Sequence, residues 1–227
     1  MTVDDDLRGN DLSANDLPTR KISSAGLYSL KAWFAARLTF VRVVLVRRGV
    51  SPNTISLAGI LFAAGAGLSL ALLPAPVAAL PVTLLLVARL AAANLDGSVA
   101  RESGRQTRWG AVLNEFGDRA ADLLVLAGLL AHVSLPLALG VLLAASMPSW
   151  VSLAGAAAGT RRINGGPVGK TERCLLVALA AATGWYTAFA VVVLAGSVVT
   201  GLLRMVRLAR EHEIAAPTGR TGQPVRG

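Results

Sequence analysis

Apolar segments of nearly membrane-spanning length follow one another along this chain, separated by short polar or proline-containing connections. The clearest of them cover roughly residues 53–73, 78–95 and 137–158. About 20 helical residues cross a bilayer core of about 30 Å. Because lipid offers no partner for backbone N–H and C=O groups, such segments have to be helical. With 54% hydrophobic and 15% charged residues and a mean hydropathy of +0.59, the chain is predicted to be an all-α polytopic membrane protein.

A polar cluster interrupts this pattern between Asn94 and Asp122, and a further apolar segment at roughly 110–131 begins inside it. Carboxylates at or near membrane depth are costly, so their presence indicates a functional site. Five of the thirteen acidic residues of the chain lie in this window: Asp96, Glu102, Glu115, Asp118 and Asp122.

The distribution of basic residues predicts the number of spans. Residues 171–207 are too many for one span and barely enough for two, with a turn expected at residues 183–185. With six spans, every basic cluster falls on the cytoplasmic side and both termini lie inside the cell. These clusters are Arg47, Arg48, Arg101, Arg105, Arg108, Arg161, Arg162, Lys170, Arg173, Arg204, Arg207 and Arg210. The opposite connections (73–81, 132–136 and 183–186) carry no Lys or Arg. We therefore expect six transmembrane helices in the cytoplasmic membrane.

The domain layout follows from the same pattern. Residues 1–24 and 209–227 are predicted to be disordered tails around a membrane domain at 25–208. Within that domain, residues 27–49 mix apolar and basic side chains and are predicted to form an interfacial amphipathic helix. The net charge of +9 is spread between apolar runs, which favours contact with membrane lipids over nucleic-acid binding. The single cysteine, Cys174, excludes an internal disulfide.

The spacing within the polar cluster favours a metal site. Asn114, Asp118 and Asp122 recur every four residues, which places them on one face of a helix. Asp96 ends the preceding span, where it faces the start of the next. Oxygen ligands from two facing helices, near cytoplasmic arginines, suit a hard divalent cation with a phosphate-bearing substrate.

The cluster resembles the signature of the CDP-alcohol phosphatidyltransferases. That signature is D-x2-D-G-x2-A-R-x8-G-x3-D-x3-D, and this chain has D-G-x2-A-R-x8-G-x3-N-x3-D from Asp96 to Asp118. The stretches 47–54 and 166–173 also look like segments of this family. Its layout of six spans after an interfacial helix is the one derived above. The first and third aspartates of the signature fall on Ala93 and Asn114.

The resemblance implies an activity and assigns roles. The family transfers a phosphatidyl (substituted phosphate) group from a CDP-lipid such as CDP-diacylglycerol to an alcohol acceptor and releases CMP. The implied metal is Mg²⁺ or Mn²⁺, weakly held, at Asp96, Asn114 and Asp118, with Glu115 as an additional candidate. Asp118 is also the implied catalytic base. The implied substrate-binding residues are Gly97, Ala100, Arg101, Gly110, Lys170 and Arg173. A homodimer is implied as well.

Three alternatives stay open at the level of sequence. The missing aspartates are compatible with a catalytically impaired relative that binds a lipid or a partner protein. Carboxylates within the membrane are also found along ion paths, which would suit a transporter or channel. Finally, Glu115 and Asp122 are placed to form ion pairs with Arg119, which would make part of the cluster structural.

Overall fold

The computed structural model describes residues 31–160 and 163–215, and every regular element in these ranges is helical. The α-helices are α1 (Lys31–Arg37), α2 (Thr39–Arg47), α3 (Pro52–Leu72), α4 (Ala79–Glu102), α5 (Arg108–Ala127), α6 (Leu135–Ala157), α7 (Lys170–Thr183) and α8 (Tyr186–Ala215). A 3₁₀ turn, η2 (Gly128–Ala131), extends α5. The predicted all-α class is confirmed.

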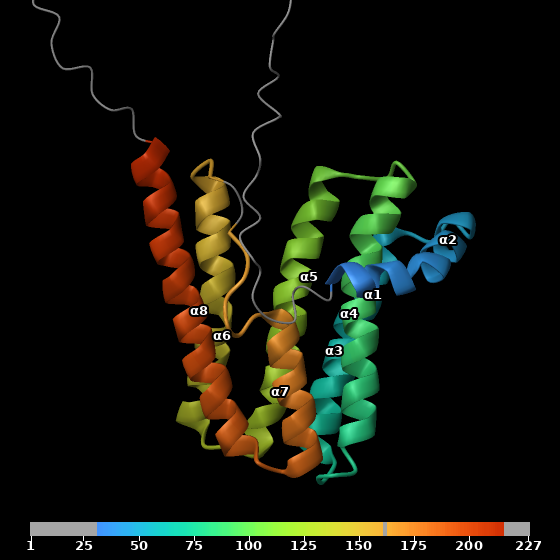
Figure 1. Ribbon diagram of the computed structural model, residues 1–227. Helices are drawn as coiled ribbons and strands as arrows, with labels where there is room; N and C mark the ends of the chain where they lie inside the picture. The colour runs from blue at the N-terminus through green and yellow to red at the C-terminus, as the bar shows by residue number, and fades with distance from the viewer. Residues whose placement is uncertain (1–30, 161–162, 216–227) are drawn as a thin grey trace, which may run out of the picture.

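Helices α3 to α8 run side by side in one bundle, and α1 and α2 lie against its flank beside α4 (Figure 1). The helix ends have local causes. Pro52 occupies the first turn of α3, where its missing N–H costs nothing. The Thr107 side chain accepts a hydrogen bond from the Gly110 N–H at 2.8 Å and so caps α5. Gly184, at a φ of 76°, ends α7 at the predicted turn.

Four helices are long and apolar enough to cross a membrane: α3, α4, α6 and α8. Helix α7 has only 14 residues, and α5 carries the polar residues Asn114, Glu115, Asp118 and Asp122. Both nevertheless belong to the bundle. The count of six spans therefore stays a prediction, as does the interfacial position of residues 27–49. Within the described part of that segment the chain forms two short helices, α1 and α2, where one was predicted.

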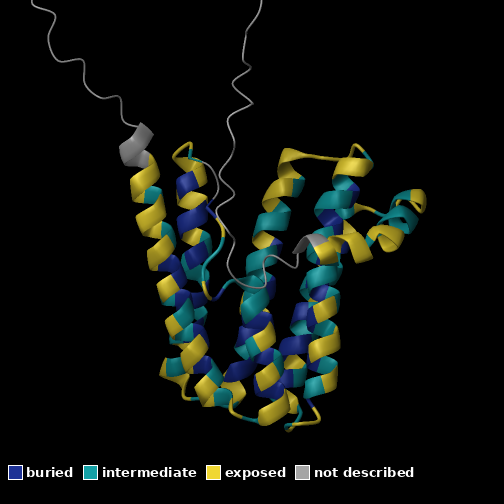
Figure 2. Ribbon diagram, viewed as in Figure 1, coloured by how far each residue is buried: buried dark blue, intermediate teal, exposed yellow. Residues whose placement is uncertain are grey.

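Inside the bundle, small residues bring the helices close together. Ala63 and Ala66 of α3 are completely buried. A Cβ on Gly67 would collide with the backbone carbonyl of Leu124 in α5, so the two backbones touch there. Buried residues face the interior of the bundle, whereas many outward-facing side chains are exposed leucines such as Leu61 and Leu84 (Figure 2). An apolar outer surface is what contact with lipid requires.

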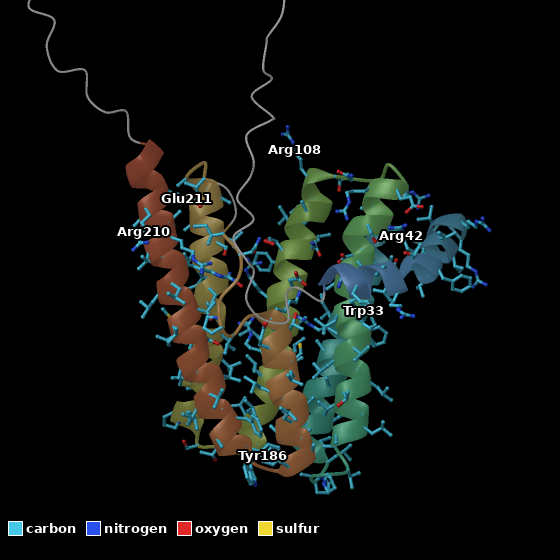
Figure 3. The ribbon with its side chains drawn as sticks, viewed as in Figure 1. Trp33, Arg42, Arg108, Tyr186, Arg210 and Glu211 are labelled. Carbon is cyan, nitrogen blue, oxygen red and sulfur yellow. The ribbon has the colours of Figure 1, made fainter. Side chains whose placement is uncertain are left out.

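The two ends of the bundle differ in charge. Arg108 and Arg210 lie at one end and Tyr186 lies at the other (Figure 3). The α4–α5 connection and the C-terminal ends of α6 and α8 share the first end (Figure 1). The α4–α5 connection and the end of α8 thus lie together (Figure 1), as the predicted distribution requires of their basic residues. Lys170 and Arg173 lie instead at the start of α7, where Arg173 is buried. The predicted tail at 1–24 lies outside the described residues, as does the part of the tail predicted at 209–227 that follows residue 215. Helix α8 continues to Ala215, past the predicted boundary at 208.

Candidate functional site

A small pocket that is open to the outside lies between α3, α4 and α5. All four positions of the aspartate signature line this pocket: Ala93, Asp96, Asn114 and Asp118. Gly117 of α5 is buried, and a Cβ there would lie 3.3 Å from Cδ1 of Ile60, so the Ile60 side chain of α3 packs directly on α5 at this depth. The structure therefore brings together the residues that spacing alone placed on two helices.

Asp96 is held from two sides. It is buried near the C-terminal end of α4. The Ser56 hydroxyl of α3 donates to its Oδ2 at 2.8 Å, and the Gly97 backbone N–H donates to its Oδ1 at 2.6 Å. Two hydrogen bonds fix the orientation of this carboxylate. Asp96 is thus a preorganised acceptor at the pocket wall.

Asp118 forms an ion pair with Lys170, the first residue of α7. Both side chains are partly exposed, at 38% and 28%. Because Lys170 follows the loop 163–169, its position depends on how that loop is held. Thr200 of α8 accepts from the Val168 N–H at 3.0 Å, and Arg204 donates to the Gly165 carbonyl at 2.9 Å. These contacts bring the start of α7 beside α5.

Asp122 lies one turn deeper and joins three helices. It pairs with Arg89 of α4 and with Arg173 of α7, the latter at 2.6 Å. The structure thus corrects the alternative in which Asp122 pairs with Arg119. The reason is that Arg89 and Arg173 approach from neighbouring helices at the depth of Asp122. The other pair of that alternative, Glu115 with Arg119, is present at 3.3 Å.

The remaining predicted substrate residues lie toward the charged end of the bundle. Gly97 and Ala100 are half-buried on α4, and Arg101 is exposed near its end. A Cβ on Gly97 would lie 3.4 Å from Nη1 of Arg101, so the arginine folds back over the glycine. Gly110 is in the first turn of α5. Arg173, in contrast, is buried and lines a separate small pocket with Asp122 and Cys174.

Sequence reasoning missed two residues that line the pocket, Ser56 and Arg89. Ser56 gave no usable signal, because a serine near a helix start is ordinary. Arg89 did give one. It is a charged residue within the apolar segment 78–95, and a charge at that depth requires a partner.

The pocket offers oxygen ligands for one divalent cation. Mg²⁺ is commonly held by one or two carboxylates together with water and substrate phosphates. Asp96, Asp118 and the amide oxygen of Asn114 fit that description. In the described part of the chain, no cluster of three or more His, Cys, Asp or Glu side chains is arranged around a metal position. Ala93 offers no ligand atom, and Glu115 is engaged by Arg119.

Sequence comparisons agree on one family. The family model for CDP-alcohol phosphatidyltransferase matches residues 49–203, which is more than half of the chain. The inner membrane protein YnbA of Escherichia coli is 32% identical over 158 residues, covering 67% of this chain and 77% of that protein. The phosphatidylinositol phosphate synthase of Streptomyces avermitilis is 29% identical over 206 residues, covering 80% of this chain and 81% of the synthase.

Solved structures give the same result. The phosphatidylinositol phosphate synthase of Mycobacterium tuberculosis in complex with manganese and citrate superposes with a TM-score of 0.59 at 25% identity. That comparison covers 83% of this chain and 95% of the synthase. The same enzyme with CDP-DAG bound gives a TM-score of 0.56 at 26% identity, covering 82% and 97%. Motif, sequence and fold therefore lead to one conclusion: this chain belongs to the CDP-alcohol phosphatidyltransferase family.

Proposed function

We propose that this protein transfers a substituted phosphate group from a CDP-lipid, such as CDP-diacylglycerol, to an alcohol acceptor and releases CMP. The observation that carries the proposal is the pocket in which all four signature positions meet, with Asp96 and Asp118 retained. Two similar proteins are phosphatidylinositol phosphate synthases, and one of them has been solved with CDP-DAG bound. We propose no acceptor more specific than an alcohol.

In this mechanism Asp118 is the catalytic base. Its carboxylate takes the proton of the acceptor hydroxyl, and the hydroxyl oxygen forms a bond to the lipid-linked phosphorus. The bond from that phosphorus to the CMP oxygen breaks, and CMP leaves. Asp96, Asn114 and Asp118 would hold a divalent ion, Mg²⁺ or Mn²⁺, which would supply charge neutralisation for the diphosphate. Asp96 keeps its orientation through Ser56 and the Gly97 N–H.

The surrounding residues bind the substrates. Gly97, Ala100, Arg101 and Gly110 lie at the charged end of the bundle, where a cytidine group entering from the cytoplasm would bind. Lys170, partly exposed beside Asp118, contacts a phosphate or an anionic acceptor. For Arg173 we propose a supporting role, because its guanidinium is buried against Asp122. Six spans, a cytoplasmic pocket and a homodimer complete the proposal.

One observation favours a second candidate, a catalytically impaired relative that binds a lipid or a partner protein. Lys170 engages the proposed base Asp118 directly, and Ala93 brings no carboxylate to the pocket. A base that stays paired with an ammonium group cannot accept a proton until the ion pair opens. The two candidates therefore differ in whether substrate separates Lys170 from Asp118.

The test is CMP release by the purified protein. Protein in lipid vesicles is incubated with CDP-diacylglycerol, with Mg²⁺ or Mn²⁺, and with a panel of alcohols that includes inositol phosphate, glycerol phosphate and serine. We expect CMP release that depends on both the alcohol and the metal. Binding of CDP-diacylglycerol without CMP release from any acceptor would favour the impaired relative.

A further inference from the structure

Arg89 is a buried cation for which the mechanism above has no use. Its side chain is only 1% exposed, although it lies in a helix apolar enough to span a membrane. One end of the guanidinium pairs with Asp122 and lies 3.4 Å from the Asp118 carbonyl. Nη1 is 4.0 Å from the Cys174 sulfur, and Nε is buried without a hydrogen-bond partner in the described structure. Arg89 therefore keeps donor capacity where it lines the pocket.

The charges around Arg89 do not balance. Two buried arginines, Arg89 and Arg173, share the single carboxylate of Asp122. A buried charge that is not fully compensated is costly, and this cost falls when an anion binds next to it. Of these three groups only Arg89 lines the pocket, where it is the cationic residue beside Asp96 and Asp118.

Ala93 opens the space above this charge. It follows Arg89 by four residues on α4, so the two side chains are neighbours on one helix face, and both line the pocket. A carboxylate at position 93 would pair with Arg89 and neutralise it. Alanine does neither, and Nε of Arg89 stays without a hydrogen-bond partner in the described structure.

We infer that Arg89 binds a phosphate oxygen of the CDP-lipid diphosphate, in the space that Ala93 leaves open. In this chain the Arg89 guanidinium then supplies positive charge to the diphosphate directly. A carboxylate at position 93 could supply positive charge only by binding a metal ion. A guanidinium is suited to this task because its planar donors match phosphate geometry. The inference rests on the proposed function, since it concerns how the same pocket holds the same donor substrate.

The test measures binding, which separates it from turnover. The Kd of CDP-diacylglycerol is determined in detergent, with Mg²⁺ and with EDTA, for wild type, Arg89→Gln and Arg42→Gln. Arg42 pairs with Glu102 at 3.0 Å, and neither residue lines the pocket, so Arg42→Gln is a control that removes an arginine and its ion pair elsewhere in the structure. We expect Arg89→Gln to weaken binding at least about tenfold in both conditions, and Arg42→Gln to change it less than about twofold.

A third variant, Ala93→Asp, distinguishes the inference from the simpler explanation that Ala93 only removes a metal ligand. According to that explanation, Ala93→Asp would restore the ligand and tighten binding of CDP-diacylglycerol in Mg²⁺. According to the inference, the new carboxylate pairs with Arg89 and weakens binding instead. Unchanged affinity in Arg89→Gln, or tighter binding in Ala93→Asp, would overturn the inference and leave the proposed function standing. Absence of CDP-diacylglycerol binding and CMP release in wild type would overturn both.

Discussion

Asp118 and Asp122 are the same residue type on the same face of α5, one helical turn apart. Asp118 is 38% exposed, lines the pocket and has a single partly exposed ammonium partner. Asp122 is 18% exposed and is held by two guanidinium groups from two other helices. Two arginines fix one carboxylate, whereas one flexible lysine leaves the other able to exchange its partner for substrate.

The comparison shows that depth in the bundle decides whether a carboxylate faces the pocket or joins helices. Near the charged end, helices α3, α4 and α5 leave a pocket, and a carboxylate there can reach a ligand. One turn further in, α7 packs close enough to bring Arg173 onto α5. An aspartate at this depth, Asp122, therefore joins helices together. Each single-residue variant therefore has to be measured for both turnover and stability, so that the two losses can be distinguished.

The largest expected effect is on turnover in Asp118→Asn. Loss of the general base should lower the rate of CMP release by about 10²- to 10⁴-fold. The unfolding free energy should change by less than about 1 kcal/mol, because the lost ion pair with Lys170 is partly exposed. Activity assays and thermal unfolding on the same preparation measure both. Retained turnover would exclude Asp118 as the base.

Asp122→Asn should show the opposite pattern. The substitution leaves Arg89 and Arg173 buried without a carboxylate, and breaking a buried ion pair costs about 3–5 kcal/mol. We expect a clearly lower midpoint of unfolding in detergent, with residual CMP release at temperatures where the variant stays folded. A variant as stable as wild type but inactive would show that Asp122 belongs to the chemistry.

Ser56→Ala tests the support of Asp96 in the pocket. The substitution removes the 2.8 Å hydrogen bond to the carboxylate, and loss of such an outer partner typically weakens metal affinity by about 10- to 100-fold. The Mg²⁺ concentration for half-maximal CMP release should rise, and the rate should recover at high Mg²⁺. Ser98→Ala is the matched control, because its hydroxyl bonds only to the carbonyls of Asn94 and Leu95. Equal metal dependence in both variants would argue against a role for Asp96 in metal binding.

The smallest expected effect is that of Glu115→Gln. Glu115 pairs with Arg119 on the same helix at 3.3 Å, and both side chains are partly exposed. Pairs of this kind contribute about 0–1 kcal/mol. We expect near-normal stability and an unchanged Mg²⁺ requirement. A strong rise in that requirement would make Glu115 a metal ligand, as the sequence allowed.

The helices could be predicted from sequence because their limits are set locally. Pro52, Thr107 and Gly184 mark ends that need no knowledge of the fold. The four-residue spacing of Asn114 and Asp118 likewise placed both on one face, and both line the pocket. Periodicity is a property of the chain itself, so these features survive any tertiary arrangement.

The partners of the carboxylates could not be predicted, because they depend on how distant helices pack. Lys170 reaches Asp118 only because the loop before α7 is held by Thr200 and Arg204 of α8. Helical spacing suggested Arg119 for Asp122, while the two arginines that bind it come from α4 and α7. Long side chains reach from one helix to another, and the spacing of residues along the sequence does not show which helices they join.

The most direct test of the central claim is CMP release from CDP-diacylglycerol in vesicles, compared between wild type, Asp118→Asn and Asp122→Asn at a temperature where all three are folded. The account predicts release by wild type that requires an alcohol and a divalent metal, near-complete loss in Asp118→Asn, and measurable release in Asp122→Asn. Wild-type protein that is folded and binds CDP-diacylglycerol, but releases no CMP with any acceptor, would contradict it.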